Sequence, residues 1–347
     1  MAKFKIATPT GASFSTAGGG YDHEMEALAG LDAEIVEGPA DEDGFIAFAR
    51  DADAIYCKAI PMTKKIIDSL SKCRTITLGS VGVDAVDVAA ATARGIPVTN
   101  CPDTFIEEVA DHCMMLMLGG FRNVIEQDRM VREGRWREGR PELLQIPRLM
   151  GQTLGFVAFG HVPRAVSMRA RPFGVTMKAY DPFIEELVMP PYGVLPATLE
   201  EVLTTSDFVS MHAPATPEAQ GMLTEKHFRM MKKTAWFVNV GRGPTVDEAA
   251  LIKALEQGWI AGAALDVLEV EPPRQDNSLL QMKNVILSAH TASASARFDP
   301  ARKRRVGQEL ALALGGRWPM SCVNPSVLSK LDRTRWQPMS MERGPNS

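Results

Sequence analysis

The sequence predicts an α/β protein with two doubly wound parallel sheets, each in a Rossmann-like domain. Short apolar runs recur along the chain with helix-like segments between them. Such alternation indicates parallel sheets with helices on both faces. Several runs are apolar throughout, as expected for strands that are covered on both faces. Because the runs fall into two sets, we expect two such domains with a cleft between them.

The predicted strands divide at about the middle of the chain. The first set covers 4–7, 34–36, 54–57, 75–78 and 97–99, and the second covers 154–159, 176–180, 208–211, 235–240, 261–267 and 285–288. Helices are expected at 103–122, at 124–133 and at 299–314, where the chain returns to the first domain. We therefore expect one domain of residues 1–101 plus 296–331, a second of 102–295, and a polar tail of 332–347.

Composition excludes several classes of protein. Apolar residues make up 45% of the 347 residues and charged residues 23%, as in ordinary soluble proteins. The net charge of −4 comes without a basic stripe, so nucleic acid is not an expected partner. No membrane span or signal peptide is expected. Five cysteines without close pairs favour neither a metal site nor disulfides, which fits a cytoplasmic protein. A reactive Cys57 or Cys101 is less expected than a buried one.

A degraded dinucleotide fingerprint follows the first strand of the second set. In this G-x-G-x-x-G pattern only Gly160 remains, with Ala158 and Pro163 at the other two glycine positions. Proline suits the first turn of a helix. The next strand ends at Asp181, where an acid that binds the adenosine ribose is expected. No arginine for a 2′-phosphate follows, so NAD is favoured over NADP; a plain turn at Asp181 is the structural alternative.

Three polar residues come late in the chain, each where an apolar run ends. They are Arg242, Glu271 and His290. Strand ends of an α/β sheet line its ligand crevice. A guanidinium can bind a carboxylate, and a carboxylate with an imidazole can serve as an acid/base pair. The pattern indicates chemistry on a small 2-oxo or 2-hydroxy acid. A surface salt bridge and a buried loop histidine are the structural alternatives, and Glu269 is the competing acid.

Several motifs in order carry a resemblance over almost the whole chain. They are residues 81–87, 94–98, 107–112, 238–243, 246–248, 264–267 and 271–272. With these motifs the chain resembles the D-isomer-specific 2-hydroxyacid dehydrogenase family. The resemblance implies an NAD-dependent oxidoreductase that interconverts a small 2-oxo acid and the D-2-hydroxy acid. It further implies that 102–295 binds NAD, that the other domain binds substrate, and that a homodimer forms around 103–122.

The resemblance also implies roles for individual residues. Arg242 would bind the substrate carboxylate and the 2-oxygen, His290 would be the acid/base, and Glu271, directly before Pro272, would orient His290. The implied cofactor contacts are Gly160, His161 and Val162 at the pyrophosphate, Asp181 at the ribose, His212, Ala213 and Pro214 along the cofactor, and Gly241 and Asp266 at the nicotinamide amide. The implied substrate contacts are Lys58, Val81, Gly82 and Arg242.

Alternatives remain open for some of these assignments. His212 is equally well explained as a core histidine, and Lys58 either recognises a second anionic or polar group or is a solvated lysine. The usual glycines after the histidine are replaced by residues 291–295, which we expect to narrow the pocket. An NAD(H)-sensing, corepressor-like binding protein on the same fold is the alternative function. Formate dehydrogenases resemble this fold with glutamine in place of Glu271, which disfavours that activity.

Overall fold

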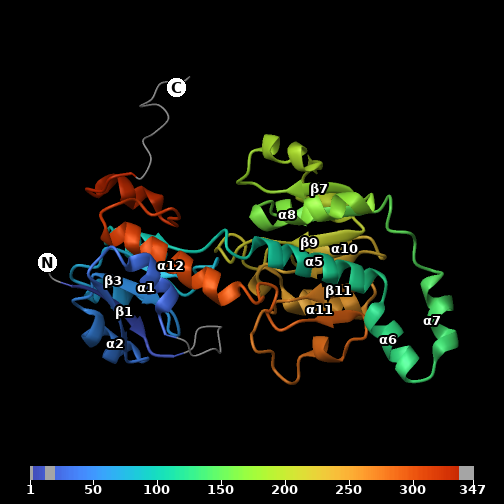
Figure 1. Ribbon diagram of the computed structural model, residues 1–347. Coiled ribbons are helices and arrows are strands. Elements are labelled where there is room, and N and C mark those ends of the chain that lie inside the picture. Colours follow the sequence, from blue (N-terminus) through green and yellow to red (C-terminus); the bar gives the residue numbers. More distant parts are fainter. Residues whose placement is uncertain (1–2, 12–19, 336–347) are drawn as a thin grey trace. The chain divides into compact units, whose positions relative to one another are not determined.

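The structure, a computed structural model, describes residues 3–11 and 20–335. The chain packs into two units, one formed by Met1–Thr104 with Ala296–Ser347 and the other by Phe105–Ser295. Each unit is a parallel sheet flanked by helices (Figure 1). Of the polar tail expected from residue 332, only 332–335 lie within the described residues, and there Thr334 bridges to Arg317.

The first unit contains a 5-stranded sheet in the order β2-β1-β3-β4-β5, with all strands parallel. The strands are β1 (Phe4–Pro9), β2 (Ala33–Gly38), β3 (Ala54–Cys57), β4 (Ile76–Leu78) and β5 (Val98–Thr99). Its helices are α1 (Asp22–Leu28), α2 (Glu42–Ala49), α3 (Lys64–Ser69), α4 (Val88–Ala93) and α12 (Phe298–Leu314). The strand order reverses between β1 and β3, so the favoured ligand position in this sheet is the carboxyl end of those strands.

The second unit contains a 7-stranded parallel sheet in the order β12-β11-β10-β9-β6-β7-β8. The strands are β6 (Thr153–Val157), β7 (Thr176–Tyr180), β8 (Val194–Pro196), β9 (Phe208–Met211), β10 (Trp236–Asn239), β11 (Gly262–Leu265) and β12 (Val285–Leu287). Its helices are α5 (Ile106–Phe121), α6 (Val124–Arg132), α7 (Trp136–Leu143), α8 (His161–Ala170), α9 (Leu199–Thr205), α10 (Glu225–Met230) and α11 (Glu248–Glu256). Here the order reverses between β6 and β9, which places the favoured ligand position after β6.

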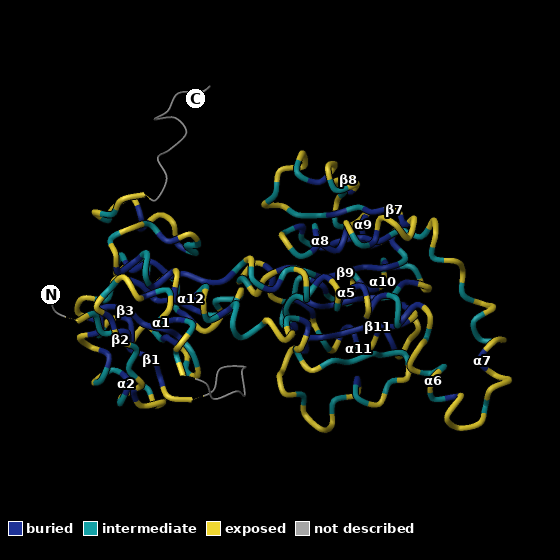
Figure 2. The backbone as a smooth tube through the Cα atoms, viewed as in Figure 1, coloured by how far each residue is buried: buried dark blue, intermediate teal, exposed yellow. Residues whose placement is uncertain are grey.

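Burial explains why the apolar runs form strands. The central strands β3, β9 and β11 are buried at every position, so apolar residues are required on both of their faces (Figure 2). Helices α6 and α7 instead carry exposed apolar side chains, among them Ile125 and Trp136, and Leu144 directly after α7 is exposed as well. Among the described residues, no helix combines the length and the apolar character that crossing a membrane requires.

All eleven predicted strands and all three predicted helices are confirmed, with ends that differ by a few residues. The sequence prediction missed β8 and α7. Strand β8 is a short edge strand with exposed Leu195 and Pro196, and so it lacks an apolar signal. Helix α7 contains Gly139 and Pro141, both of which disfavour helix by propensity.

Candidate active site

Strand β10 ends in a tightly packed loop that presents Arg242. The Asn239 side chain accepts a hydrogen bond from Gly241 N at 3.0 Å and donates one to the Arg242 carbonyl at 3.2 Å. A Cβ on Gly243 would lie 1.8 Å from the carbonyl oxygen of Leu268, so only glycine fits there. The loop that carries Arg242 is therefore fixed by its own backbone and by the segment that leads to Glu271.

Glu271 and His290 meet as an acid/base pair. His290 Nδ1 lies 2.6 Å from Glu271 Oε2, and Glu271 Oε1 accepts the Leu268 N–H at 3.0 Å. Partial burial raises the pKa of the Glu271 carboxyl, but the hydrogen bonds from His290 and from the Leu268 N–H outweigh it and leave the pKa lowered. Glu271 is thus ionised at neutral pH and can only accept, so His290 Nδ1 carries a proton.

Asp266, at the end of β11, holds the turn that contains His290. Its Oδ1 accepts the Ser288 hydroxyl at 2.6 Å and the Thr291 N–H at 2.9 Å, and its Oδ2 accepts the Ala292 N–H at 2.9 Å. The Asp266 carbonyl accepts the His290 N–H at 2.8 Å. Burial raises the pKa of Asp266, but these donors and His112 outweigh it and hold the pKa well below its usual range.

These contacts give Asp266 a structural role. Its side chain, which was expected at a nicotinamide amide, is 1% exposed, and its oxygens accept donors from its own chain. His290 has a left-handed φ of 51°, which is costly for a residue other than glycine and requires a supporting structure. The structure therefore assigns to Asp266 the positioning of the His290 turn.

His112 completes this network from helix α5. Its Nε2 lies 2.8 Å from Ser288 Oγ and 3.4 Å from Asp266 Oδ1. Because the Ser288 hydroxyl donates to Asp266, Ser288 Oγ accepts from His112, and His112 Nε2 must carry a proton. In the sequence, His112 lies in a family motif without an assigned role, and Ser288 lies in a predicted strand. The contact between His112 and Ser288 depends on packing between segments that are distant along the chain, so no local sequence pattern predicts it.

The loop after β6 has the geometry of a dinucleotide site. Ala158 stands at the first glycine position of the fingerprint and adopts a left-handed φ of 72°. Gly160 precedes helix α8, and a Cβ on Gly160 would meet nothing within 4 Å, so open space lies in front of the helix N-terminus. The free N–H groups of His161 and Val162 in that first turn suit a phosphate group. Pro163 is buried in the same turn.

Asp181, expected at the adenosine ribose, is bonded within the chain. Its Oδ2 accepts the Phe159 N–H and its Oδ1 the Phe183 N–H, both at 2.8 Å. The bond from Phe183 forms the plain turn that the sequence offered as the structural alternative for Asp181. The first bond ties the end of β7 to the phosphate loop. Each carboxylate oxygen has a further lone pair, so Asp181 can hold the loop and still accept a ribose hydroxyl.

His212 follows β9 and is a neutral histidine. Its Nε2 lies 2.8 Å from Ser210 Oγ, and its ring packs at 5.9 Å from the ring of Phe156. Burial lowers the pKa of His212 to about 3. A Cβ on Gly241 would lie 3.2 Å from both the Ala213 carbonyl and the His212 Cα, so the segment of His212 and Ala213 contacts the Arg242 loop. Pro214 is exposed beside it.

In the first unit, Val81 and Gly82 lie in the loop after β4. The carbonyls of this loop are engaged: Gly82 accepts the Ser80 hydroxyl and Val81 accepts Asn100 Nδ2, both at 2.6 Å. Among the residues that the structure describes, the N–H groups of Val81 and Gly82 donate no hydrogen bond. These two groups are thus available to an anion.

Lys58, which follows β3 in the same unit, is not a solvated lysine. Its side chain is 11% exposed, and its Nζ lies 2.7 Å from the Tyr21 hydroxyl and 3.1 Å from Glu37 Oε1. Of the two alternatives that the sequence left open for Lys58, the solvated lysine is contradicted, because two residues distant along the chain enclose the ammonium group. Cys57 and Cys101, the two cysteines considered as reactive thiols, are buried, and burial raises the pKa of each to about 12.

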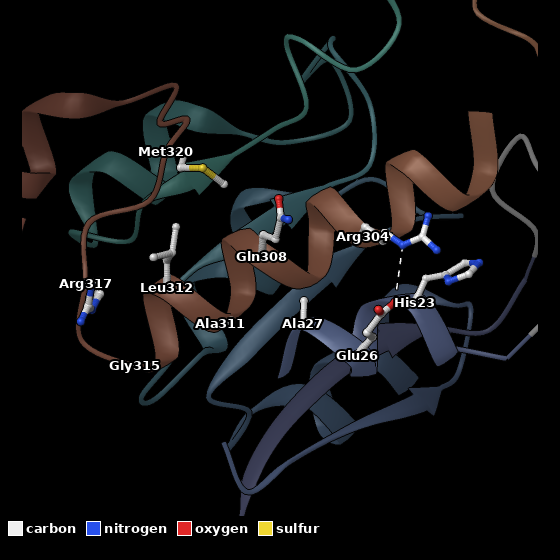
Figure 3. Close-up of a pocket in the computed structure, with 10 residues that line it drawn as sticks. All are labelled: His23, Glu26, Ala27, Arg304, Gln308, Ala311, Leu312, Gly315, Arg317 and Met320. Atoms are coloured by element: carbon white, nitrogen blue, oxygen red, sulfur yellow. Dashed lines mark hydrogen bonds and ion pairs between the residues drawn. The ribbon is translucent and has the colours of Figure 1, made fainter. Parts of the chain in front are cut away.

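A surface hollow of about 590 Å³ lies elsewhere on the first unit. Helices α1 and α12 line it, with Glu26 and Arg304 paired across it and Met320 at its far end (Figure 3). It contains neither Lys58 nor the loop of Val81. Within the described ranges, no group of three or more His, Cys, Asp or Glu side chains is placed to hold a metal ion.

The fold and the site together define a class of protein. An open helix N-terminus after the first strand of a doubly wound sheet fits a dinucleotide, and an ionised carboxylate that orients an imidazole fits proton transfer. Both features lie in the second unit, in a set of loops that follow the carboxyl ends of its strands. The class is that of the nicotinamide-dependent oxidoreductases.

Comparison with known proteins narrows this class. Residues 114–292 match the family model of the D-isomer specific 2-hydroxyacid dehydrogenase, NAD binding domain. A glyoxylate reductase of Korarchaeum cryptofilum is 39% identical over 300 residues, which cover 86% of this chain and 90% of the relative. A D-3-phosphoglycerate dehydrogenase of Methanocaldococcus jannaschii is 34% identical over 84% of this chain and 55% of its own length.

A solved structure agrees with these sequence matches. The NADPH-dependent glyoxylate/hydroxypyruvate reductase of Sinorhizobium meliloti superposes with a TM-score of 0.78 at 29% identity, covering 97% of this chain and all of the other. The chain belongs to the D-isomer-specific 2-hydroxyacid dehydrogenase family. It is an enzyme that interconverts 2-oxo and 2-hydroxy acids with a nicotinamide cofactor. The relatives named here are enzymes, so they give no support to the corepressor-like alternative.

Proposed function

We propose that this enzyme reduces a small 2-oxo acid to the D-2-hydroxy acid with His290 as the acid/base. The observation that carries the proposal is the 2.6 Å contact between His290 Nδ1 and Glu271 Oε2, which orients the imidazole ring. In the reduction direction the imidazolium would donate its Nε2 proton to the carbonyl oxygen, and in oxidation the neutral ring would take up that proton at Nε2. The bound nicotinamide supplies or accepts the hydride.

Arg242 is proposed to bind the substrate carboxylate and the 2-oxygen. Its loop is fixed by Asn239 and Gly243, so the guanidinium starts from a defined backbone position. A planar guanidinium can hold two oxygens at once and stays charged at every assay pH. The N–H groups of Val81 and Gly82 are proposed as further donors to the carboxylate. On this assignment the first unit is the substrate-binding domain and the second is the NAD-binding domain.

The cofactor contacts are proposed at the carboxyl end of β6 and around it. The N–H groups of Gly160, His161 and Val162 would bind the pyrophosphate at the N-terminus of α8. Asp181 would accept the ribose hydroxyls, and the backbone of His212, Ala213, Pro214 and Gly241 would border the cofactor. A carboxylate at position 181 repels a 2′-phosphate, which supports NAD over NADP. The Sinorhizobium meliloti relative is NADPH-dependent, so both cofactors are to be compared.

A cytoplasmic homodimer is proposed as the working form. The five cysteines are free, which fits a reducing compartment. The expected interface helix, α5, uses much of its apolar face inside its own unit, with Cys113, Met114 and Met117 buried. The exposed Ile125, Trp136 and Leu144 of the α6 and α7 region supply apolar surface that a second copy could cover.

The test is a panel of 2-oxo acids with NADH and with NADPH, followed by nicotinamide absorbance. The panel contains glyoxylate, hydroxypyruvate, pyruvate and a branched-chain 2-oxo acid. We expect turnover of glyoxylate or hydroxypyruvate, the substrates named for several relatives, with NADH preferred. If no 2-oxo acid is reduced with either cofactor, the proposal is wrong.

A further inference from the structure

In the first unit, Lys58 lies at the carboxyl end of its strand and forms an ion pair with Glu37. Lys58 follows β3, Glu37 lies in the last part of β2, and Tyr21 directly precedes α1. Lys58 Nζ lies 2.7 Å from the Tyr21 hydroxyl and 3.1 Å from Glu37 Oε1, and the Tyr21 hydroxyl also donates to Glu37. The three groups form a closed triangle of hydrogen bonds.

Burial distinguishes this pair from ordinary surface pairs. The Lys58 side chain is 11% exposed, whereas Lys64 and Lys65, which also pair with carboxylates, are 69% and 60% exposed. Hydrogen bonds from Tyr21 and from Lys58 lower the pKa of Glu37, so its charge persists at neutral pH. An enclosed ammonium group with two partners is less able to turn toward a ligand than a solvated one.

The pair lies at the carboxyl ends of the strands, where a ligand of this sheet is expected. Strands β3 and β4 are neighbours and parallel, so Lys58 and the loop of Val81 and Gly82 leave the sheet at the same edge. The strand order reverses between β1 and β3, and Lys58 follows directly after β3. Ligands of open α/β sheets bind at such a reversal, at the carboxyl ends of the strands.

Arg302, which lies beneath the carboxyl ends of these strands, is also paired with a carboxylate. A Cβ on Gly79 would lie 3.0 Å from an Arg302 guanidinium nitrogen, so Arg302 packs under the loop after β4. Arg302 is 5% exposed and binds the Asp299 carboxylate and the Tyr56 hydroxyl. Residues 12–19, between β1 and α1, contain neither lysine nor arginine in their sequence. Lys58 and Arg302 are therefore each paired with a carboxylate.

We propose that the Glu37–Lys58–Tyr21 cluster restricts the enzyme to 2-oxo acids whose side group carries no charge. This inference rests on the proposed function, in which Arg242 and the loop of Val81 bind the one carboxylate that every substrate has. A phosphate or a second carboxylate on the substrate would meet a lysine that is already neutralised and the negative charge of Glu37. The second anion would thus be rejected for two reasons: the fixed charge of Glu37 repels it, and Lys58 is already paired and does not bind it.

Wild-type enzyme is compared on two matched pairs of substrates. Hydroxypyruvate is set against 3-phosphohydroxypyruvate, and pyruvate against oxaloacetate. We expect kcat/KM to be about a hundredfold lower for the anionic member of each pair, within the range of selectivity that a single site achieves. If the anionic members are reduced as efficiently as the neutral ones, this inference is overturned while the proposed function stands. If neither member of any pair is reduced, the proposed function itself fails.

The cluster is then altered by Glu37→Gln, which frees Lys58 from its counter-charge. We expect the ratio of kcat/KM for the anionic member to that for the neutral member to rise about tenfold or more. In the double variant with Lys58→Met the gain is expected to vanish. Glu34→Gln is the matched control, because Glu34 lies in the same strand and pairs with Lys3 at 2.8 Å on the surface.

Each outcome bears on the inference. A folded Glu37→Gln variant with an unchanged ratio overturns it, and so does an equal rise in Glu34→Gln. Persistence of the gain without Lys58 also overturns it, because the lysine is the group that is released. Circular dichroism and a thermal scan establish that the variants are folded. If Glu37→Gln does not fold, equal kcat/KM values for the two members of each pair in the wild type still overturn the inference.

Discussion

Replacement of Glu271 by glutamine tests how the carboxylate acts on His290. The carboxylate accepts two hydrogen bonds, from His290 Nδ1 and from Leu268 N. A glutamine side chain has one acceptor oxygen, so it can satisfy only one of these donors, and its NH2 group then faces the other. Either the Leu268 N–H loses its partner, or His290 must take up the tautomer with the proton on Nε2.

The expected loss of kcat/KM follows from the strength of a hydrogen bond to a charged group and from the solvent exposure of His290 and Glu271. A hydrogen bond to a charged group contributes about 1.5–3 kcal/mol. Because the side chains of His290 and Glu271 are 32% and 35% exposed, solvent screening favours the lower end of that range. About 1.4 kcal/mol is a factor of ten in rate and one unit in pH. We therefore expect kcat/KM for reduction at neutral pH to fall about tenfold or more in Glu271→Gln.

The assay is the pH profile of kcat/KM for glyoxylate reduction between about pH 5 and pH 9. Because Glu271 is proposed to orient His290 throughout this range, the fall in kcat/KM should appear across the whole profile. Glu269→Gln is the matched control, because Glu269 is an exposed acid two residues away. If kcat/KM of Glu271→Gln equals that of the wild type across the profile, Glu271 does not act through His290.

Three further predictions concern the supporting structure. Gly243→Ala should lower the melting temperature and the turnover, because its Cβ would lie 1.8 Å from a carbonyl oxygen; Gly30→Ala, with nothing within 4 Å, is the control in thermal scans. Asp181→Ala should weaken NADH binding about tenfold in a fluorescence titration, with a smaller effect on NADPH. His212→Gln should change stability with pH. The folded-state pKa of His212 is about 3, so the wild type loses stability as pH falls below the ordinary value of 6.5. In denaturant titrations the wild-type free energy of unfolding should fall, relative to the variant, by up to about 1.4 kcal/mol per pH unit.

The strands could be predicted because buried strands of parallel sheets require continuous apolar runs. Strand β9 is buried at every position and is correspondingly clear in the sequence. Edge strand β8 has two exposed residues out of three, so solvent removes the selection for apolar side chains there. The trio of Arg242, Glu271 and His290 was visible because polar residues that end apolar runs lie at strand ends.

The contacts that fix these groups could not be predicted, since they join segments distant along the chain. His112 and Ser288 are 176 residues apart and Lys58 and Glu37 are 21 apart, and each pair depends on which helix or strand packs beside another. Asp266 shows the same limit, because its support of the His290 turn depends on contacts with residues 22 to 26 positions further along the chain.

The central claim, that His290 is the acid/base of the reaction, is tested most directly by His290→Gln. Turnover of glyoxylate and binding of NADH are measured on the same preparation, the latter by fluorescence titration. General acid–base catalysis contributes about 10²–10⁴-fold, so we expect kcat to fall within that range while the Kd for NADH stays close to that of the wild type. A variant that binds NADH and reduces glyoxylate at nearly the wild-type rate would contradict the account.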